Sequence, residues 1–220
     1  GATLFRANYE GDVGLHVAKA IWGVKQLMER GQLSAVGDQG EKDNEVIIGK
    51  NDGNTPLKLT DLRELIPADK ANFLGQGYAV GSKDYEENEE SKKEIIALNK
   101  AIYIEPQNVE LWSETRKWSL EYFDSVYKRL GTHFDRLFFE SEVEKPGRLL
   151  VIEGIQKGIF IKDPDGSVYF PGEKVGLNNC VFVTKEGYAT YEGKDIAVED
   201  LEYKTFPFDV DIHVVANEQQ

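Results

Sequence analysis

Thr190-Tyr191-Glu192-Gly193-Lys194-Asp195 is the stretch that best indicates how this chain folds. A helix that begins at Tyr191 places Asp195 one turn further on, so the phenol and the carboxylate project from the same face. A carboxylate can accept two parallel N–H bonds from a planar cation such as a guanidinium, while a phenol orients or stacks on it. An aromatic residue and an acid four positions apart are also common on helices, where they are usually only core and surface.

The run that follows at 208–215, Phe-Asp-Val-Asp-Ile-His-Val-Val, predicts a buried strand. This run leads into the polar residues Asn217, Glu218 and Gln219. In open α/β sheets, binding groups gather at the carboxyl ends of the strands. The sequence therefore predicts a binding group where this last strand ends.

Strands and helices alternate along the second half of the chain. The predicted elements are a strand at 134–140, a helix from Val143 with Pro146 in its first turn, a hairpin at 159–170, a strand at 180–184, the helix from Tyr191 and the last strand. This order is typical of an α/β fold with a mostly parallel sheet and crossover connections. By contrast, the residues from 31 to 133 carry mainly helical patterns, including a long helix after Asn108.

The first 30 residues predict a short strand followed by a helix. Apolar residues recur at helical spacing from Val13 to Met28, and Asp12 is placed to cap this helix. His16 falls on the first turn beside that acid. A histidine in such a position is more often without chemistry than a catalytic base, so we assign His16 no catalytic role.

Two further patterns suggest ligand sites but are better explained as structure. The run 75–81, Gly-Gln-Gly-Tyr-Ala-Val-Gly, has glycines at the wrong spacing for a phosphate loop and follows helical sequence. Asp209, Asp211 and His213 share one face of the predicted last strand, but the apolar residues between them favour a sheet with one wetter face. We therefore expect no metal site.

Three matches, in order along the chain, resemble the catalytic domain of arginyl-tRNA synthetases. The matching stretches are Asn8–Gly14, Phe134-Asp135 with Glu140-Ser141-Glu142, and Val181–Tyr191 with Asp195 and the strand leading to Gln219. The resemblance covers about residues 1–30 and 107–220. It implies a Rossmann-like, mostly parallel sheet, with 1–30 as the first part of the nucleotide-binding fold, 31–133 as a helical insertion and 134–220 as the return into that fold.

The resemblance also implies roles for particular residues. In that family a tyrosine, an aspartate four positions later and a glutamine at the end of the next strand bind the substrate arginine; here these are Tyr191, Asp195 and Gln219. His213 and Asn217 are placed by position beside the ATP site. Between Tyr191 and Asp195 this chain departs from the small or basic residues expected, and Ala216 stands where a glycine is expected.

The activity implied for the whole enzyme is activation of arginine with ATP and Mg²⁺, followed by transfer to tRNA(Arg), with activation awaiting bound tRNA. The two ATP signatures of class I synthetases, His-Ile-Gly-His and Lys-Met-Ser-Lys-Ser, do not occur in this sequence. We therefore expect an internal fragment of the catalytic domain that contains no catalytic residue, holds no bound cofactor and is inactive alone. The rival hypothesis is a synthetase-like, non-catalytic interaction module or paralogue; a third is an unrelated sugar-nucleotide or hydrolytic enzyme.

The composition of the chain limits the classes of partner that it is expected to bind. The chain has 26 basic and 39 acidic residues and a net charge of −13. Surfaces that coat DNA or grip tRNA broadly carry the opposite sign, so neither is expected of this segment by itself. One cysteine excludes an internal disulfide framework, and no stretch of about 18 apolar residues predicts a membrane span. The expected location is the cytoplasm.

Overall fold

The computed structural model describes residues 1–31 and 55–215. The chain divides into two compact units, which are described separately below. One unit combines Gly1–Glu10 with Phe134–Gln220, and the other comprises Gly11–His133. The first contains all the strands of the described residues and is called the α/β unit. The second is called the helical unit.

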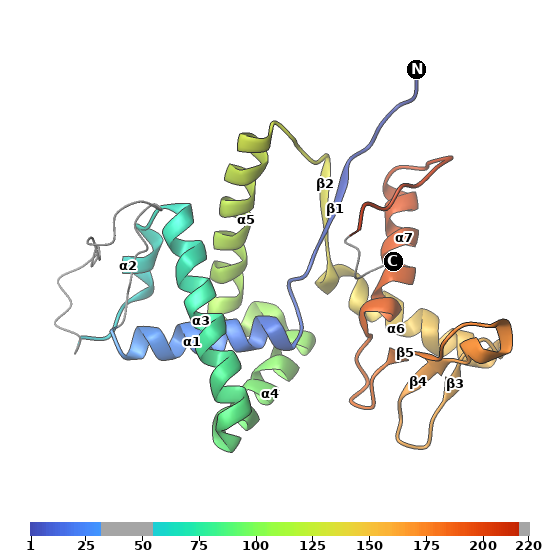
Figure 1. The fold of residues 1–220 in the computed structure, drawn as a ribbon, viewed down its shortest axis with the longest axis horizontal. Helices are drawn as coiled ribbons and strands as arrows, with labels where there is room; N and C mark the ends of the chain where they lie inside the picture. The colour runs from blue at the N-terminus through green and yellow to red at the C-terminus, as the bar shows by residue number, and fades with distance from the viewer. Residues whose placement is uncertain (32–54, 216–220) are drawn as a thin grey trace. The chain divides into compact units, whose positions relative to one another are not determined.

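The α/β unit holds two small sheets and two long helices (Figure 1). Its elements are β1 (Ala7–Glu10), β2 (Arg136–Phe139), α6 (Glu140–Gln156), β3 (Ile161–Lys162), β4 (Val168–Phe170), the 3-10 turn η2 (Gly172–Val175), β5 (Cys180–Val183) and α7 (Tyr191–Thr205). Strands β1 and β2 pair in parallel, with Tyr9 opposite Phe138. Strands β3, β4 and β5 form a separate antiparallel sheet. The described residues therefore form a mixed α/β structure.

Helix α6 follows β2 without a loop and packs along α7. Glu142 begins the helix by accepting a hydrogen bond from the backbone N–H of Phe139 (2.9 Å). Phe138 and Val143 are fully buried together with Ala197 and Val198 of α7. A second core cluster joins Val151, Val168 and Val183, so α6 also covers the antiparallel sheet.

Three expectations for this unit were wrong. The sheet is not mostly parallel, because the predicted hairpin and the 180–184 strand form an antiparallel meander. Pro146 lies inside α6, because the helix begins at Glu140 instead of near Val143. The run 208–215 is not a buried strand: Val210, Ile212 and Val214 are 74%, 78% and 94% exposed. Their alternation fits a strand, but no described strand pairs with this backbone, and an isolated strand is not stable.

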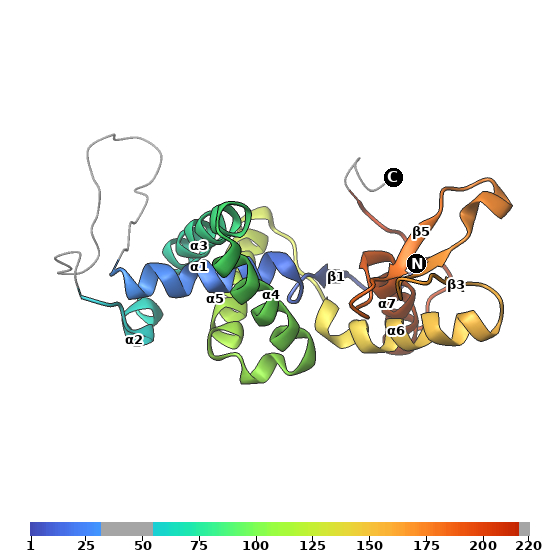
Figure 2. The same cartoon turned by 90° about the horizontal axis from the view of Figure 1, so that it is seen from below.

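The helical unit consists of five helices in its described residues (Figure 2). They are α1 (Leu15–Glu29), α2 (Leu59–Arg63), α3 (Pro67–Glu87), α4 (Glu89–Ile104) and α5 (Glu110–Leu130), with the short turn η1 (Pro106–Asn108) before α5. Helix α1 lies at the centre and contributes to both apolar clusters of the unit. Phe73 and Trp118 are fully buried in one cluster, and Ile95 and Ile102 in the other. No helix in the described ranges has an apolar window long enough to cross a bilayer.

The turn before α1 differs from its predicted role. Gly14, with a φ of 108°, occupies the N-cap position of α1, two residues after Asp12. Asp12 is buried and accepts a hydrogen bond from Nε of Arg116 on α5 (3.0 Å). His16 contacts the hydroxyl of Tyr78 through Nδ1 (3.0 Å). The acidic residue of this turn therefore helps to hold α5 in place.

The glycine run at 75–81 lies within α3 and serves helix packing. A Cβ atom at Gly77 would lie 2.8 Å from the backbone N of Val24 on α1, and one at Gly81 would meet the carbonyl oxygen of Lys19. These distances are too short for a side chain, so the two helix backbones approach closely only because glycine stands there. At Gly75 a Cβ atom would meet nothing within 4 Å.

Alanine substitutions at two of these glycines should have opposite effects. We expect Gly81→Ala to destabilise the chain by about 1–3 kcal/mol, because the new methyl group meets backbone that no rotamer change can move. Gly75→Ala should stabilise it by about 0.5–1 kcal/mol, because α3 loses less backbone entropy on folding. Urea unfolding followed by circular dichroism measures both. Equal signs for the two variants would contradict the close crossing of α1 and α3.

Candidate functional site

The first turn of α7 is anchored to β5 through its capping residue. Thr190 donates a hydrogen bond from Oγ1 to the carbonyl of Val181 (2.7 Å) and one from its backbone N–H to the carbonyl of Phe182 (3.0 Å). The same Oγ1 accepts the backbone N–H of Gly193 (3.3 Å). Helix α7 therefore begins at Tyr191, as predicted, and Asp195 lies one turn further on.

Glycine at position 193 lets this turn lie directly against its neighbours. A Cβ atom on Gly193 would meet the carbonyl oxygen of Phe182, and a Cβ atom on Gly147 of α6 would meet the carbonyl oxygen of Gly193. Gly193 was noted in the sequence only as a departure from the expected pattern. Its role here is close packing of α7 against β5 and α6.

A buried ion pair fixes α7 to the end of the parallel strands. Nζ of Lys194 lies 2.6 Å from Oε2 of Glu140, and the two side chains are only 7% and 13% exposed. Glu140 is the first residue of α6 and directly follows β2. The start of α7 is thus held at the carboxyl end of β1 and β2, where binding groups of parallel α/β sheets lie.

Asp195 is the unusual side chain of this region. Its Oδ1 is buried and has no hydrogen-bond partner among the described residues. Burial, reinforced by the negative charges of Glu192 and Glu140, raises the pKa of Asp195 to about 6, although the charges of Lys194 and His213 act in the opposite direction. A buried oxygen without a donor is costly. This position therefore suits a ligand that brings a cation with N–H donors.

Tyr191 lies beside this carboxylate. Burial, followed by the charges of Asp195, Glu140 and Glu192, raises the pKa of the Tyr191 phenol. The side chain is still 46% exposed. Its ring lies 6.5 Å from the ring of Tyr9 on β1, at an angle of 40°. Two aromatic rings and one carboxylate thus come together from β1 and α7, an arrangement that suits a flat cation.

The other predicted site residues are only partly placed by the structure. His213 follows α7 in the chain, and its Nε2 lies 2.8 Å from Oδ2 of Asp211. This hydrogen bond is the main cause of the raised pKa of His213, and the charge of His213 in turn lowers the pKa of Asp195. Asn217 and Gln219 lie outside the described residues. Tyr191, Asp195 and His213 are therefore the predicted residues that the structure brings into one region.

The residues that were weighed and rejected as a metal site in the sequence are only partly brought together in the structure. His213 and Asp211 lie together with Glu202 of α7, and their ligand atoms are within 4.8 Å of one another. Asp209 is not part of this group. Asp211 and His213 are exposed, and exposed acidic groups with this spacing are common without a bound ion, so we assign the cluster no role.

Three contributors were not recognised from the sequence. Tyr9 was seen only within the Asn8–Gly14 match, Glu140 only within the acidic turn, and Lys194 only as a departure from the expected pattern. Glu140 and Lys194 are separated by 54 positions. Nothing in local spacing signals such a pair, although a lysine directly before the predicted site aspartate was a visible hint.

Comparison with known proteins confirms the resemblance stated from the sequence. The arginine–tRNA ligase of Treponema denticola is 30% identical over 224 residues, which span 100% of this chain and 33% of that protein. The arginine–tRNA ligase of Amoebophilus asiaticus is 29% identical over 225 residues, spanning 100% of this chain and 35% of that protein. That of Porphyromonas gingivalis is 34% identical over 111 residues, or 50% of this chain. No protein-family profile matches the chain. The chain spans about a third of the length of the two relatives that match it throughout.

Removing the charge of Asp195 should stabilise the folded chain. The pKa of this carboxyl rises from about 4 in an unfolded chain to about 6 in the fold, so ionisation costs stability as the pH rises through this range. After allowance for solvent screening, we expect Asp195→Asn to be about 1 kcal/mol more stable than the native sequence at pH 7.5, with no difference at pH 4. Chemical unfolding at several pH values measures this.

The matched control for that measurement is Asp200→Asn on the same helix. Asp200 is exposed and paired with Lys204 one turn away. Its substitution should change stability by less than about 0.5 kcal/mol. An Asp195→Asn variant that is less stable than the native sequence at pH 7.5 would show that the carboxylate has a stabilising partner in the fold.

Removing only Lys194 from the Lys194–Glu140 pair should lower the free energy of unfolding more than removing both charges. We expect Lys194→Met to destabilise the chain by about 3 kcal/mol, because Glu140 is left buried without its cation. The double variant Lys194→Met with Glu140→Gln should recover a large part of this loss. Lys204→Met, which removes an exposed pair, is the control and should be nearly neutral. A double variant no more stable than Lys194→Met alone would contradict the assigned pairing.

Proposed function

We propose that this chain is part of the catalytic domain of an arginine–tRNA ligase and contributes the pocket for the substrate guanidinium. The observation that carries this proposal is the buried, unpartnered Oδ1 of Asp195 beside Tyr191 at the carboxyl end of the parallel strands. The relation to arginine–tRNA ligases along the whole chain supports it. In this proposal β1 and β2 belong to a larger Rossmann-like sheet that residues 1–30 enter and residues 134–220 re-enter, and 31–133 is a helical insertion.

Asp195 accepts two parallel N–H bonds from the substrate guanidinium. The positive charge of the substrate offsets the burial of Asp195 and the repulsion from Glu192 and Glu140, so its binding lowers the pKa of Asp195 and keeps the carboxylate ionised at neutral pH. Lys194 neutralises Glu140 by direct pairing. At the start of α7, Asp195 is distinguished from Glu140 and the exposed Glu192 by its buried Oδ1 without a hydrogen-bond partner among the described residues.

Tyr191 orients the guanidinium plane, and Gln219 adds a hydrogen bond to the substrate. A flat cation fits between an aromatic ring and a carboxylate, and Tyr9 supplies a second ring on the β1 side. Lysine presents a compact ammonium in place of the fork, and citrulline has no charge. Either would leave Asp195 poorly paired, which costs a few kcal/mol and is enough for discrimination.

The full-length protein would use ATP and Mg²⁺ to activate arginine and would then transfer it to tRNA(Arg) in the cytoplasm. ATP supplies the α-phosphate that the arginine carboxylate attacks. This chain's contribution to that reaction is to bind and orient arginine, with His213 and Asn217 beside the adenosine. We assign no catalytic residue within the chain, and we expect the 220 residues to be inactive by themselves.

The competing proposal is a non-catalytic, synthetase-like interaction module. Its support is the size of the helical unit, which in the described residues carries no part of the site assigned above. The two proposals differ in whether arginine is activated. A module would bind its partner without any dependence on Asp195.

The test is ATP–pyrophosphate exchange by the full-length protein with arginine, with and without tRNA(Arg). We expect Asp195→Ala to lose at least a hundredfold in kcat/KM for arginine, and Tyr191→Phe to lose less, because the ring remains. Asp200→Ala on the exposed side of α7 is the matched control and should retain activity. Exchange that survives in Asp195→Ala would remove the site assignment, and absence of arginine-dependent exchange in the native protein would favour the module.

A further inference from the structure

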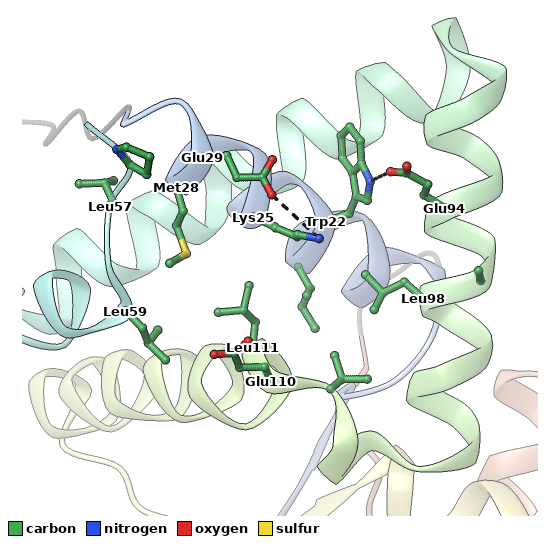
Figure 3. Close-up of a pocket in the computed structure, with 14 residues that line it drawn as sticks. Trp22, Lys25, Met28, Glu29, Leu57, Leu59, Glu94, Leu98, Glu110 and Leu111 are labelled. Atoms are coloured by element: carbon green, nitrogen blue, oxygen red, sulfur yellow. Dashed lines mark hydrogen bonds and ion pairs between the residues drawn. The ribbon is translucent and has the colours of Figure 1, made fainter. Parts of the chain in front are cut away.

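A pocket of about 640 Å³ opens in the helical unit between α1, α4, α5 and the segment just before α2 (Figure 3). This volume is within the range of sites that take drug-sized molecules. The side chains that define its chemistry are Trp22, Leu98 and Leu111, which are apolar, and Glu29, Glu94 and Glu110, which are acidic. The pocket lies within one unit, and none of its residues belongs to the site proposed above.

The floor of the pocket is apolar and held by the core. Ile21 and Trp22 of α1 are buried in one core cluster, and Leu57 is buried in the other. Leu98 and Leu111 are packed against these clusters. Because these side chains are fixed by core packing, the concave shape exists without a ligand, which reduces the free-energy cost of binding.

The rim of the pocket is acidic. Glu94 is held in place by a hydrogen bond from Nε1 of Trp22 (2.7 Å), so one carboxylate is fixed directly above the apolar floor. Figure 3 shows Glu110 on α5 across the pocket from Lys25 and Glu29 on α1. Lys25 and Glu29 are exposed and lie 4.0 Å apart, a weak pair. Three carboxylates thus face one ammonium group around this opening.

We propose that this pocket binds an organic cation with an apolar body, such as an amine on an aromatic or aliphatic skeleton. The apolar floor takes the body of such a molecule, and the carboxylates on the rim take its charge. The same rim repels phosphates and carboxylates, which disfavours nucleic acid and acidic metabolites as occupants. This proposal rests on the pocket alone and does not depend on arginine activation.

The test compares three probes that share the same apolar phenylbutyl group and differ in charge. 4-Phenylbutylamine, 4-phenylbutanol and 4-phenylbutyrate are titrated separately into the 220-residue chain, and methyl NMR shifts of Ile21, Leu98 and Leu111 are followed. We expect the amine to bind with a Kd of about 1 mM. The alcohol should bind several-fold more weakly, and the carboxylate at least tenfold more weakly than the amine.

Two variants separate charge from shape. Glu110→Gln should weaken binding of the amine several-fold and leave binding of the alcohol unchanged. Glu90 is an exposed acid that does not line the pocket, so Glu90→Gln should change the affinity for neither probe. Ala97→Phe, at an exposed position lining the pocket, should abolish binding of all three probes by filling the space.

Three results would each overturn the proposal. They are no binding of the amine at 10 times the expected Kd, equal binding of amine and carboxylate, and unchanged affinity in both Glu110→Gln and Ala97→Phe. Glu110 is exposed on the first turn of α5, so its variant tests the charge requirement even if the bulkier substitution does not fold.

Discussion

The buried ion pair between Lys194 and Glu140 is the contact on which the α/β unit depends. It joins the first turn of α7 to the first residue of α6, and α6 continues directly from β2. Replacing such a pair by apolar side chains is often neutral, whereas leaving one charge alone is strongly destabilising. Thr190 sets where α7 begins, and the ion pair ties this first turn to the start of α6. The positions of Tyr191 and Asp195 follow from it, because both lie within one turn of Lys194.

Glycine provides the other constraint, and it acts in both units. Gly193 and Gly147 allow α7 to lie against β5 and α6, and Gly77 and Gly81 allow α3 to cross α1. In each case the neighbour is backbone, which cannot move aside as a side chain can. In the sequence, Gly77 and Gly81 belonged to a run with the wrong spacing for a phosphate loop, and Gly193 was only a departure from the expected pattern. Their common role is to let secondary-structure elements approach closely, and this role depends on partners far away in the sequence.

Patterns within a few residues predicted much of this fold. Contacts between residues far apart in the sequence could not be predicted from those patterns. Periodicity located the central helix α1, the β3–β4 hairpin, β5 and the start of α7 at Tyr191, because those signals lie within a few residues. It did not show that β5 pairs with this hairpin in an antiparallel sheet, since strand order depends on contacts between segments that local pattern does not encode. For the site, the face shared by Tyr191 and Asp195 followed from helical spacing. The partner of Lys194 did not, and neither did the isolation of Asp195 Oδ1, because both are properties of packing.

The two acidic sites proposed for this chain differ in how far their carboxylates are exposed to water. We therefore expect them to bind different kinds of cation. Asp195 lies partly buried beside aromatic rings, and the pKa of its carboxyl is raised first by burial and then by the neighbouring acids. Its folded environment disfavours ionisation, so a cation that enters gains both the direct bond and the relief of repulsion. Such a position is suited to the small flat cation that we propose as its ligand. The carboxylates around the pocket of the helical unit stand instead on the rim of an apolar hollow, exposed to water, where each contributes little alone. In the proposed complex, most of the binding free energy at the pocket comes from burying the apolar body of the ligand. The carboxylates mainly decide whether a cationic, neutral or anionic ligand binds best.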